Sequence, residues 1–504
     1  MYSESEVLEM VDKSVEAGLK LFSEKKYFMA DVLLSQTLKV NPDNVRALQI
    51  LGLIKHNADK LDEAIGIFKK ALEYDPNNAE NHNNIALSYG RQGKFSTAID
   101  HLVTAIDINP KCHYLYSNLG IQHRQNKQPG LAMEFFRHSL HLKPDPQTYC
   151  MLGGCYGELR RLHEAEDCFR RALELDPQFA PAHCDLATIH HLRGDWAEGW
   201  KEYEWRFEAH EQTKFWFKLY DHGKRWYGEP LDGKRIILHN EQGAGDSIHF
   251  FRYVPLLKKM GANVIVHCSE DLASLYAPHV DEVYTTDPSG IPLFLDRPKD
   301  YPMPEYDYFT SLLSLPYLLG NPAIPKTPYL FTDHKINLDV YSDYFKVGIV
   351  WAGNPQHPND AIRSCRLNRF RAIHDLPGVK LFSLQKDKRH RQYRYSTESV
   401  DLTEKCEDMK IVDMADQMNT FEDTAAILKS LDLVVSVDTS VVHLAGAIGT
   451  PCWAMIPYNT DWRWKLTGGT TEWYSSVRLF RQPEPGNWNA AFDCVLEELK
   501  KEIS

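Results

Sequence analysis

Residues 50–76 read ILGLIKHNADKLDEAIGIFKKALEYDP, and this stretch decides the fold of the first part of the chain. It contains a Leu-Gly pair followed by Ala64, Phe68 and Ala71, and it ends at Pro76. The same order recurs upstream of evenly spaced prolines, at Pro42, Pro76, Pro110, Pro144 and Pro177. Small residues allow two helices to approach closely, large apolar residues fill the space between units, and proline ends the second helix. The spacing therefore predicts a stack of two-helix units.

This pattern closely resembles the tetratricopeptide repeat, which implies an α-solenoid of about six repeats over residues 1–213. An atypical first unit begins near Val11, and a divergent sixth unit begins near Ala180. The sixth unit ends in a Trp-rich stretch at residues 196–207. We expect this last unit to cap the array and to dock on the following domain.

The resemblance also implies a binding groove. In protein O-GlcNAc transferases, which share this layout, asparagines at one position per repeat hold an extended peptide backbone. The matching positions here are Glu16, Ile50, Asn84, Asn118, Met151 and Asp185. Asn84 and Asn118, with Asp185 as a near match, are therefore candidate acceptor-binding residues for a protein or peptide. Ordinary surface polar residues are the alternative.

The composition of the chain argues against some classes of function. It has 504 residues, 43% of them apolar and 25% charged, which is typical of a globular protein with several domains. A net charge of −12 argues against a nucleic-acid partner, which needs a basic surface. The sequence has neither a readable signal peptide nor about 18 uninterrupted apolar residues, so we expect a cytoplasmic protein without a membrane span. The ten cysteines include no C-x-x-C motif, so we expect reduced thiols.

The pattern changes after a Trp- and charge-rich junction at residues 214–233. Short β-branched runs then alternate with helical stretches, which is typical of parallel sheets and the α/β class. The predicted strands are Arg235–Asn240, Asn263–Cys268, Val280–Thr285, Lys346–Ala352, Val379–Gln385, Lys410–Met414, Leu433–Val437 and Cys452–Ile456. We expect two Rossmann-like lobes, at residues 234–340 and 345–487. A final helix, at residues 488–504, is expected to pack back on the first lobe, as in glycosyltransferases of the GT-B type.

Two motifs follow predicted strands at the start of helices. Glu241-Gln242-Gly243-Ala244-Gly245-Asp246 forms a glycine-rich turn, where the backbone can approach a ligand closely. Asp246 is either a cap of the next helix or a general base in a cleft. Asp438-Thr439-Ser440 opens a second helix, whose free N–H groups favour an anion such as a diphosphate. His443 lies one turn later, on the same face as Thr439; a capped helix with a core histidine is the alternative.

A third motif opens the second lobe. Gly348-Ile349-Val350-Trp351-Ala352-Gly353-Asn354 is a strand that ends in a small-residue turn, and Arg363 follows it. An arginine can bind a phosphate with two parallel hydrogen bonds, although a solvated arginine is the plain alternative. Trp351, Gly353, Asn354, Arg363 and Gln385, which ends a later predicted strand, are candidate donor-binding residues.

The turn and the Asp-Thr-x-x-x-His helix resemble the ADP-heptose–lipopolysaccharide heptosyltransferase superfamily. With the repeats and the segments Asp461-Trp462-Arg463-Trp464 and Leu479-Phe480-Arg481-Gln482, the whole chain resembles bacterial tetratricopeptide-repeat proteins with a C-terminal glycosyltransferase-like domain. The resemblance implies Asp246 as catalytic base, and Asp438, Thr439, Ser440 and His443 as ligands of the donor diphosphate. Gln242, Gly243 and Gly245 fall on the acceptor side. Those enzymes also use a lysine after the Trp-containing strand; here Arg363 or Arg366 stands in its place.

The expected activity is inverting glycosyl transfer from a nucleotide sugar, with no cofactor beyond this substrate. No two aspartates are spaced as D-x-D, so the usual metal–diphosphate anchor is missing and we expect no metal. Two alternatives stay open. The chain could be an adaptor with an inactive transferase-like domain, or a transferase acting on a lipid-linked or cell-surface glycan.

Overall fold

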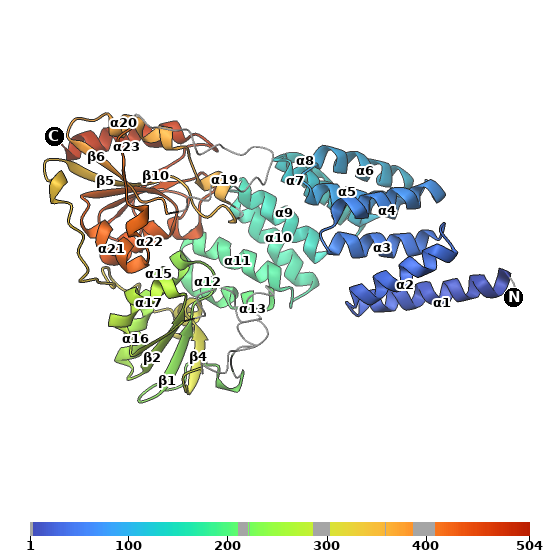
Figure 1. The fold of residues 1–504 in the computed structure, drawn as a ribbon, viewed down its shortest axis with the longest axis horizontal. Helices are drawn as coiled ribbons and strands as arrows, with labels where there is room; N and C mark the ends of the chain where they lie inside the picture. Colours follow the sequence, from blue (N-terminus) through green and yellow to red (C-terminus); the bar gives the residue numbers. More distant parts are fainter. Residues whose placement is uncertain are drawn as a thin grey trace. The chain divides into compact units, whose positions relative to one another are not determined.

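The computed structural model describes residues 4–209, 220, 222–285, 303–357, 359–386 and 409–503. Packing divides the chain into two compact units, Met1–Asp185 and Leu186–Ser504. Figure 1 shows helices alone in the first unit, and sheets with flanking helices in the second. Fold class was therefore predicted correctly: a helical solenoid precedes an α/β region with parallel sheets.

The first unit is a series of paired helices. Their bounds are α1 (Glu4–Ser23), α2 (Tyr27–Val40), α3 (Val45–Asn57), α4 (Leu61–Tyr74), α5 (Ala79–Arg91), α6 (Phe95–Ile108), α7 (His113–Gln125), α8 (Pro129–Leu142), α9 (Pro146–Glu158), α10 (Leu162–Leu175) and α11 (Ala180–Arg193). Side chains such as Asn44, Asn78 and Asp145 cap first helices of the pairs. Among the described residues of this unit there is no β-strand, as the repeat prediction requires.

Glycine fixes the approach of the two helices in a pair. A Cβ atom added to Gly52 would lie 2.4 Å from the ring of Phe68, and one added to Gly153 would lie 2.5 Å from the ring of Phe169. Both rings are buried, so neither can move aside without disturbing the packing. The Leu-Gly pair and the later phenylalanine of the repeat pattern are thus in direct contact.

The division between the units falls inside α11. The repeat array was predicted to extend further, to residue 213. The second half of the sixth repeat, α12 (Trp196–Tyr203), packs within the second unit. Trp200 is buried in the same core as Phe250 and Trp462, which belong to the α/β region. The Trp-rich end of the array is therefore part of the second unit.

The first lobe holds a parallel sheet with the strand order β3-β2-β1-β4. Its strands are β1 (Arg235–His239), β2 (Asn263–Cys268), β3 (Glu282–Thr285) and β4 (Tyr308–Ser311). Helices α15 (Ala244–Phe250), α16 (Val254–Lys259) and α17 (Glu270–Tyr276) pack their buried residues into one core with this sheet.

The second lobe holds a parallel sheet with the order β10-β9-β8-β5-β6-β7. Its strands are β5 (Phe345–Val350), β6 (Val379–Ser383), β7 (Val412–Asp413), β8 (Leu433–Val437), β9 (Cys452–Ile456) and β10 (Val477–Arg481). Counted within the lobe this is the order 3-2-1-4-5-6 read in reverse, the order of the dinucleotide-binding fold. The strand order reverses between β5 and β8, where such folds bind ligands.

Helices cover both faces of this sheet (Figure 1). Helices α21 (Phe421–Lys429) and α22 (Ser440–Ile448) lie on one face, and α20 (Arg371–His374) and α23 (Trp488–Glu502) lie on the other. The expected placement of the last helix on the first lobe is wrong. Its apolar face, which includes Phe492 and Val495, joins the core of the second lobe, because a short connection from β10 leads straight back to the same sheet.

Candidate functional site

The candidate residues gather at the carboxyl ends of parallel strands. The glycine-rich turn follows β1, the Trp351–Asn354 turn follows β5, and Asp438 follows β8. The last two strands flank the point where the strand order of the second sheet reverses. Polar side chains at this edge of an α/β sheet are in the usual position to bind a ligand.

The two helix starts, α15 and α22, are in direct contact. A Cβ atom added to Gly245 would lie 3.3 Å from the Cα atom of Ser440 and 3.0 Å from the ring of His443. Any larger residue at position 245 would push the two helices apart. The sequence motifs that start with Glu241 and with Asp438 therefore converge in the folded second unit.

Asp246 has two partners. Its Oδ2 atom accepts a hydrogen bond from the N–H of Gly243 at 3.2 Å, at the start of α15. Its Oδ1 atom pairs with Nη2 of Arg463, from the second lobe. Burial raises the pKa of Asp246, while the Arg463 guanidinium lowers it and the Asp461 carboxylate raises it. The side chain keeps 23% of its surface exposed, so it is still accessible to a ligand.

Arg463 is a buried, charged residue of the second lobe that contacts Asp246 of the first lobe. Its side chain is 7% exposed, and its Nη1 atom binds both carboxylate oxygens of Asp461 at 3.0 and 3.1 Å. The rings of Trp462 and Phe250 enclose it. Sequence reasoning did not predict a role for Arg463, although an arginine between two tryptophans, Trp462 and Trp464, was the available signal.

Helix α22 begins as the sequence predicts. Thr439 is its N-cap, and the Thr439 hydroxyl accepts from the N–H of Val441 at 3.3 Å. Asp438, directly before it, is partly buried. Burial and the nearby Asp461 carboxylate raise the pKa of Asp438 to about 7, against the opposing effects of Trp464, Arg363 and Arg463. The helix start can therefore hold Asp438 in its uncharged form near neutral pH, which favours an anionic ligand.

His443 is buried and takes part in a network between the lobes. The Tyr474 hydroxyl lies 2.9 Å from Nδ1 of His443 and 2.9 Å from Nδ1 of His249. One hydroxyl can donate only once, so one of the two histidines must carry its proton on Nδ1. Burial lowers the pKa of His443 well below its ordinary value, with Arg463 adding to the effect, so His443 is neutral at physiological pH. The ring also stacks on Trp464.

The turn after β5 is held by two side chains that were candidate donor ligands. Gln385 bonds both the N–H and the carbonyl of Ala352, each at 3.1 Å, so its amide supports the turn. The Arg363 guanidinium lies over Gly353, where a Cβ atom would be 2.4 Å from Nη2. Trp351 is partly buried, and Asn354 is exposed. Of this group, Arg363 is close enough to Asp438 to affect its pKa.

The groove candidates all belong to the solenoid. Asn118 donates from Nδ2 to Oδ1 of Asn83 at 2.7 Å. Asn84 is 6% exposed, and its Nδ2 atom is buried without a hydrogen-bond partner. Burial raises the pKa of Asp185 to about 7, with Arg124 acting in the opposite direction.

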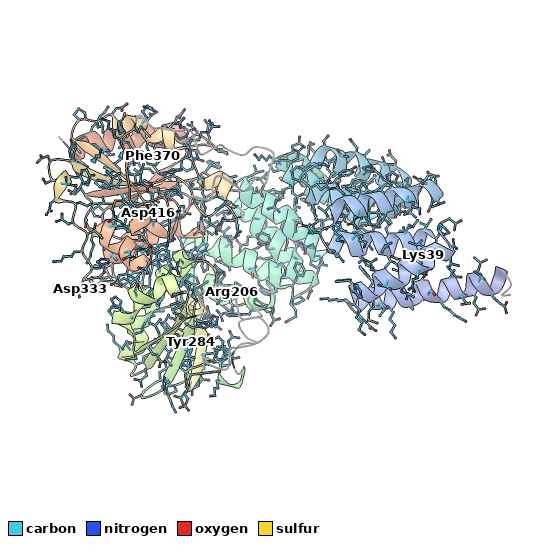
Figure 2. All side chains as sticks on the ribbon, viewed as in Figure 1. Lys39, Arg206, Tyr284, Asp333, Phe370 and Asp416 are labelled. Atoms are coloured by element: carbon cyan, nitrogen blue, oxygen red, sulfur yellow. The ribbon has the colours of Figure 1, made fainter. Side chains whose placement is uncertain are left out.

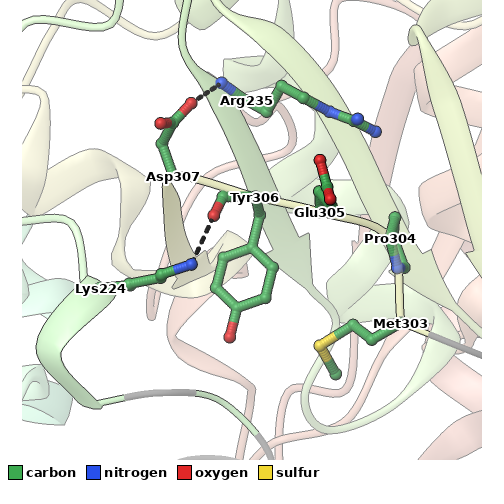
Figure 3. Close-up of a pocket in the computed structure, with 7 residues that line it drawn as sticks. All are labelled: Lys224, Arg235, Met303, Pro304, Glu305, Tyr306 and Asp307. Atoms are coloured by element: carbon green, nitrogen blue, oxygen red, sulfur yellow. Dashed lines mark hydrogen bonds between the residues drawn. The ribbon is translucent and has the colours of Figure 1, made fainter.

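A separate pocket of about 520 Å³ opens beside the first sheet, lined by Lys224, Arg235, Met303, Pro304, Glu305, Tyr306 and Asp307 (Figure 3). Asp307 accepts from the N–H of Arg235, and Lys224 donates to the carbonyl of Tyr306. The pocket lies at the amino ends of β1 and β4, opposite the edge that carries Asp246. It is therefore not part of the candidate site.

The described part of the chain contains no group of three or more His, Cys, Asp or Glu side chains arranged to hold a metal ion. Within the same residues, no helix combines the length and the apolar character needed to cross a bilayer.

Comparison with known proteins agrees with both halves of the chain. Residues 52–93, 79–112 and 146–179 match tetratricopeptide repeat families. Residues 378–480 match the family described as Glycosyltransferase family 9 (heptosyltransferase). This match includes Asp438–His443 and Arg463, whereas Asp246 and Arg363 lie outside it. The chain thus carries tetratricopeptide repeats and a C-terminal family 9 domain, which supports a glycosyltransferase activity.

Three similar proteins illustrate the two halves. Protein FlbA of Caulobacter vibrioides is 25% identical over 494 residues, which cover 92% of this chain and 80% of FlbA. The BBSome complex member BBS4 of Bos taurus is 27% identical over 132 residues, 26% of this chain and 25% of that protein. The solved structure of Pseudomonas aeruginosa PilF covers 42% of this chain and 99% of its own, with 20% identity and a TM-score of 0.36.

Proposed function

We propose that this chain is an inverting, metal-independent glycosyltransferase that moves a sugar from a nucleotide-sugar donor to an acceptor hydroxyl. The observation that carries the proposal is the contact between the two helix starts. Gly245, next to the partly exposed Asp246 carboxylate, packs against Ser440 at the start of α22, where helix N–H groups favour an anion. A base beside a diphosphate site is the arrangement that such a transfer needs.

The donor diphosphate would bind at the start of α22. Helix N–H groups and the helix dipole favour its negative charge there, and a protonated Asp438 adds no repulsion. Arg363 supplies a positive charge from the turn after β5. Neutral His443 contributes a ring nitrogen and not a charge. These groups would stabilise the diphosphate as it leaves, without a metal ion.

The acceptor would react on the Asp246 side. Asp246 takes the proton of the acceptor hydroxyl, the oxygen attacks the anomeric carbon, and the bond from that carbon to the diphosphate breaks. Attack from the side opposite the leaving group inverts the anomeric centre. Arg463 lowers the pKa of Asp246, against the larger effect of burial, and so favours the charged form that accepts the proton.

The acceptor is proposed to be a protein, bound in the repeat array by the groove that contains Asn84, Asn118 and Asp185. Tetratricopeptide repeats suggest protein partners, and amide side chains suit an extended backbone. A cytoplasmic location and the predicted bounds of the two lobes, residues 234–340 and 345–487, belong to the same proposal.

A melting-shift screen with UDP-, GDP-, ADP- and CMP-sugars tests the donor side. We expect one nucleotide class to raise the melting temperature and to bind by calorimetry. His443→Ala should then weaken nucleoside-diphosphate binding by about 1–3 kcal/mol, the range for a hydrogen bond to a charged group. A wild-type chain that binds none of the four classes would contradict the proposal.

An adaptor with an inactive transferase-like domain is the second candidate. One observation favours it: both oxygens of Asp246 already have structural partners, in Gly243 and Arg463. Hydrolysis or transfer of a bound nucleotide sugar would separate the two functions, because an adaptor turns over neither. A lipid-linked or cell-surface glycan as acceptor keeps the chemistry and changes only the role of the repeats.

A further inference from the structure

A short segment at the end of the helical array, Tyr203–Phe207, contacts the loop that leads from β1 into α15, the helix that carries Asp246. The Gln242 amide donates from Nε2 to the Tyr203 hydroxyl at 2.7 Å. Arg206 donates from Nε to Oε1 of Glu241 at 2.6 Å. Two successive loop residues are therefore bound by two side chains of one segment, which we call the clamp segment.

The Arg206 side chain, labelled in Figure 2, is held by several hydrogen-bond partners. It is 1% exposed, and Glu241 is 4% exposed. Beyond Glu241, the guanidinium donates to Oε1 of Glu204 and to Oγ of Ser314, both at 2.8 Å. The rings of Tyr203 and Phe207 lie 4.7 and 4.1 Å from its centre. A buried guanidinium with this many partners has a single defined position, so it can hold the Glu241 carboxylate in place.

The loop contains a residue in an unfavourable backbone conformation. Gln242 is exposed and has a φ of 65°, in the left-handed region that a side chain of its size rarely adopts. Gly243, the next residue, is also exposed and gives its N–H to Asp246. A change in the Gln242 backbone would therefore move the Gly243 N–H and the Asp246 carboxylate that accepts from it.

We propose that the clamp segment is part of the transferase site and that Tyr203 and Arg206 are positioning residues, which hold Glu241 and Gln242 so that Asp246 faces the acceptor hydroxyl. This inference rests on the proposed role of Asp246 as the base. It assigns a function in the site to the Trp-rich end of the repeat array, which packs in the second unit. The repeat array then ends as a component of the enzyme and not as a separate recruitment module.

The test compares Tyr203→Phe with Tyr156→Phe in the full chain. Each variant removes one hydroxyl that bonds a side chain, since the Tyr156 hydroxyl accepts from Arg137 at 2.7 Å within the solenoid. We expect Tyr203→Phe to lower kcat about 10-fold, with the donor KM nearly unchanged, because small misplacement of a catalytic group is costly. Tyr156→Phe should keep the parental kcat. Tyr203→Phe should also speed hydrogen exchange in the loop around Gln242.

A double-mutant cycle shows whether the effect passes through the loop. Gln242→Met lowers kcat, and adding Tyr203→Phe to it should cost little more, because the bond is already lost. Arg206→Lys, which keeps the charge but not the fork geometry, should also lower kcat more than donor affinity. If the effects of Tyr203→Phe and Gln242→Met multiply instead, or if Tyr203→Phe keeps the parental kcat, the clamp has no catalytic role.

Hydrogen exchange separates this inference from the proposed function. Faster exchange of the loop in Tyr203→Phe, in a chain whose wild type transfers no sugar, would support the clamp and count against the transferase. If the wild type transfers sugar but Tyr203→Phe leaves hydrogen exchange in the loop unchanged, the result would support the transferase and count against the clamp.

Discussion

Replacing Asp246 with Asn tests the proposed base and has a stability cost that the structure predicts. The carboxylate has two oxygens in use, one on the Gly243 N–H and one on Arg463. Asparagine has a single carbonyl oxygen, so it satisfies one partner and presents its NH₂ group to the other. The variant then loses either the bond from the Gly243 N–H at the start of α15, worth about 1 kcal/mol, or a hydrogen bond to a charged group, worth about 1.5–3 kcal/mol.

Transfer should fall much further than stability. We expect a rate at least about 10²-fold lower for Asp246→Asn, the usual contribution of a general base, while donor binding by calorimetry stays near the parental value. Initial rates are measured at saturating donor and acceptor, together with the free energy of unfolding in urea.

A matched control exists in the second lobe. Asp423 occupies the third position of α21, as Asp246 does in α15; it accepts from the N–H of Thr420 at 2.9 Å, and it lies 3.3 Å from His334. Asp423→Asn should therefore cost about 1 kcal/mol of stability and leave the transfer rate unchanged. If Asp246→Asn transfers sugar at the parental rate per folded molecule, Asp246 is only a cap and an ion-pair partner, and the base lies elsewhere.

Three further outcomes are expected. Because the pKa of Asp438 is raised from 3.8 to about 7, the folded chain binds an extra proton between these values, and stability from this group is lost as the pH rises through that window. Asp438→Asn should thus gain stability relative to the wild type as the pH rises from about 4 to about 7 in urea unfolding; a pH-independent difference would contradict the pKa shift. Gly245→Ala should weaken both stability and donor binding, since its Cβ atom would lie 3.3 Å from Ser440 Cα, whereas Gly66→Ala, with no atom within 4 Å, should stabilise by about 0.4–1 kcal/mol. EDTA should leave transfer unchanged; loss of activity that Mg²⁺ or Mn²⁺ restores would refute the metal-independent mechanism.

Local patterns of the sequence were enough to predict the secondary structure of both halves. The helix pairs were predictable because the contact of Gly52 with Phe68 is made within one repeat and recurs at a fixed spacing. Most strands were predictable because a strand buried on both faces is a continuous apolar run, as in Leu433–Val437. Two strands were not predicted. They are β4 and β10, and β10 alternates charged and apolar residues at a sheet edge.

Residue types at the site were also readable from the sequence, but their partners were not. The Asp-Thr-Ser start of α22 predicts an N-terminal anion site from local geometry alone. Nothing local predicts that Arg463 pairs with Asp246, that Tyr474 links His443 to His249, or that Arg206 holds Glu241.

Each of these contacts joins residues from different elements, and most of them lie far apart in the sequence. Such contacts depend on how the sheets and the end of the repeat array pack together. The sequence by itself determined which side chains were available for chemistry. Tertiary packing decided which charges are buried, which carboxylates are paired and which loop is held, because burial and pairing are properties of neighbours in space.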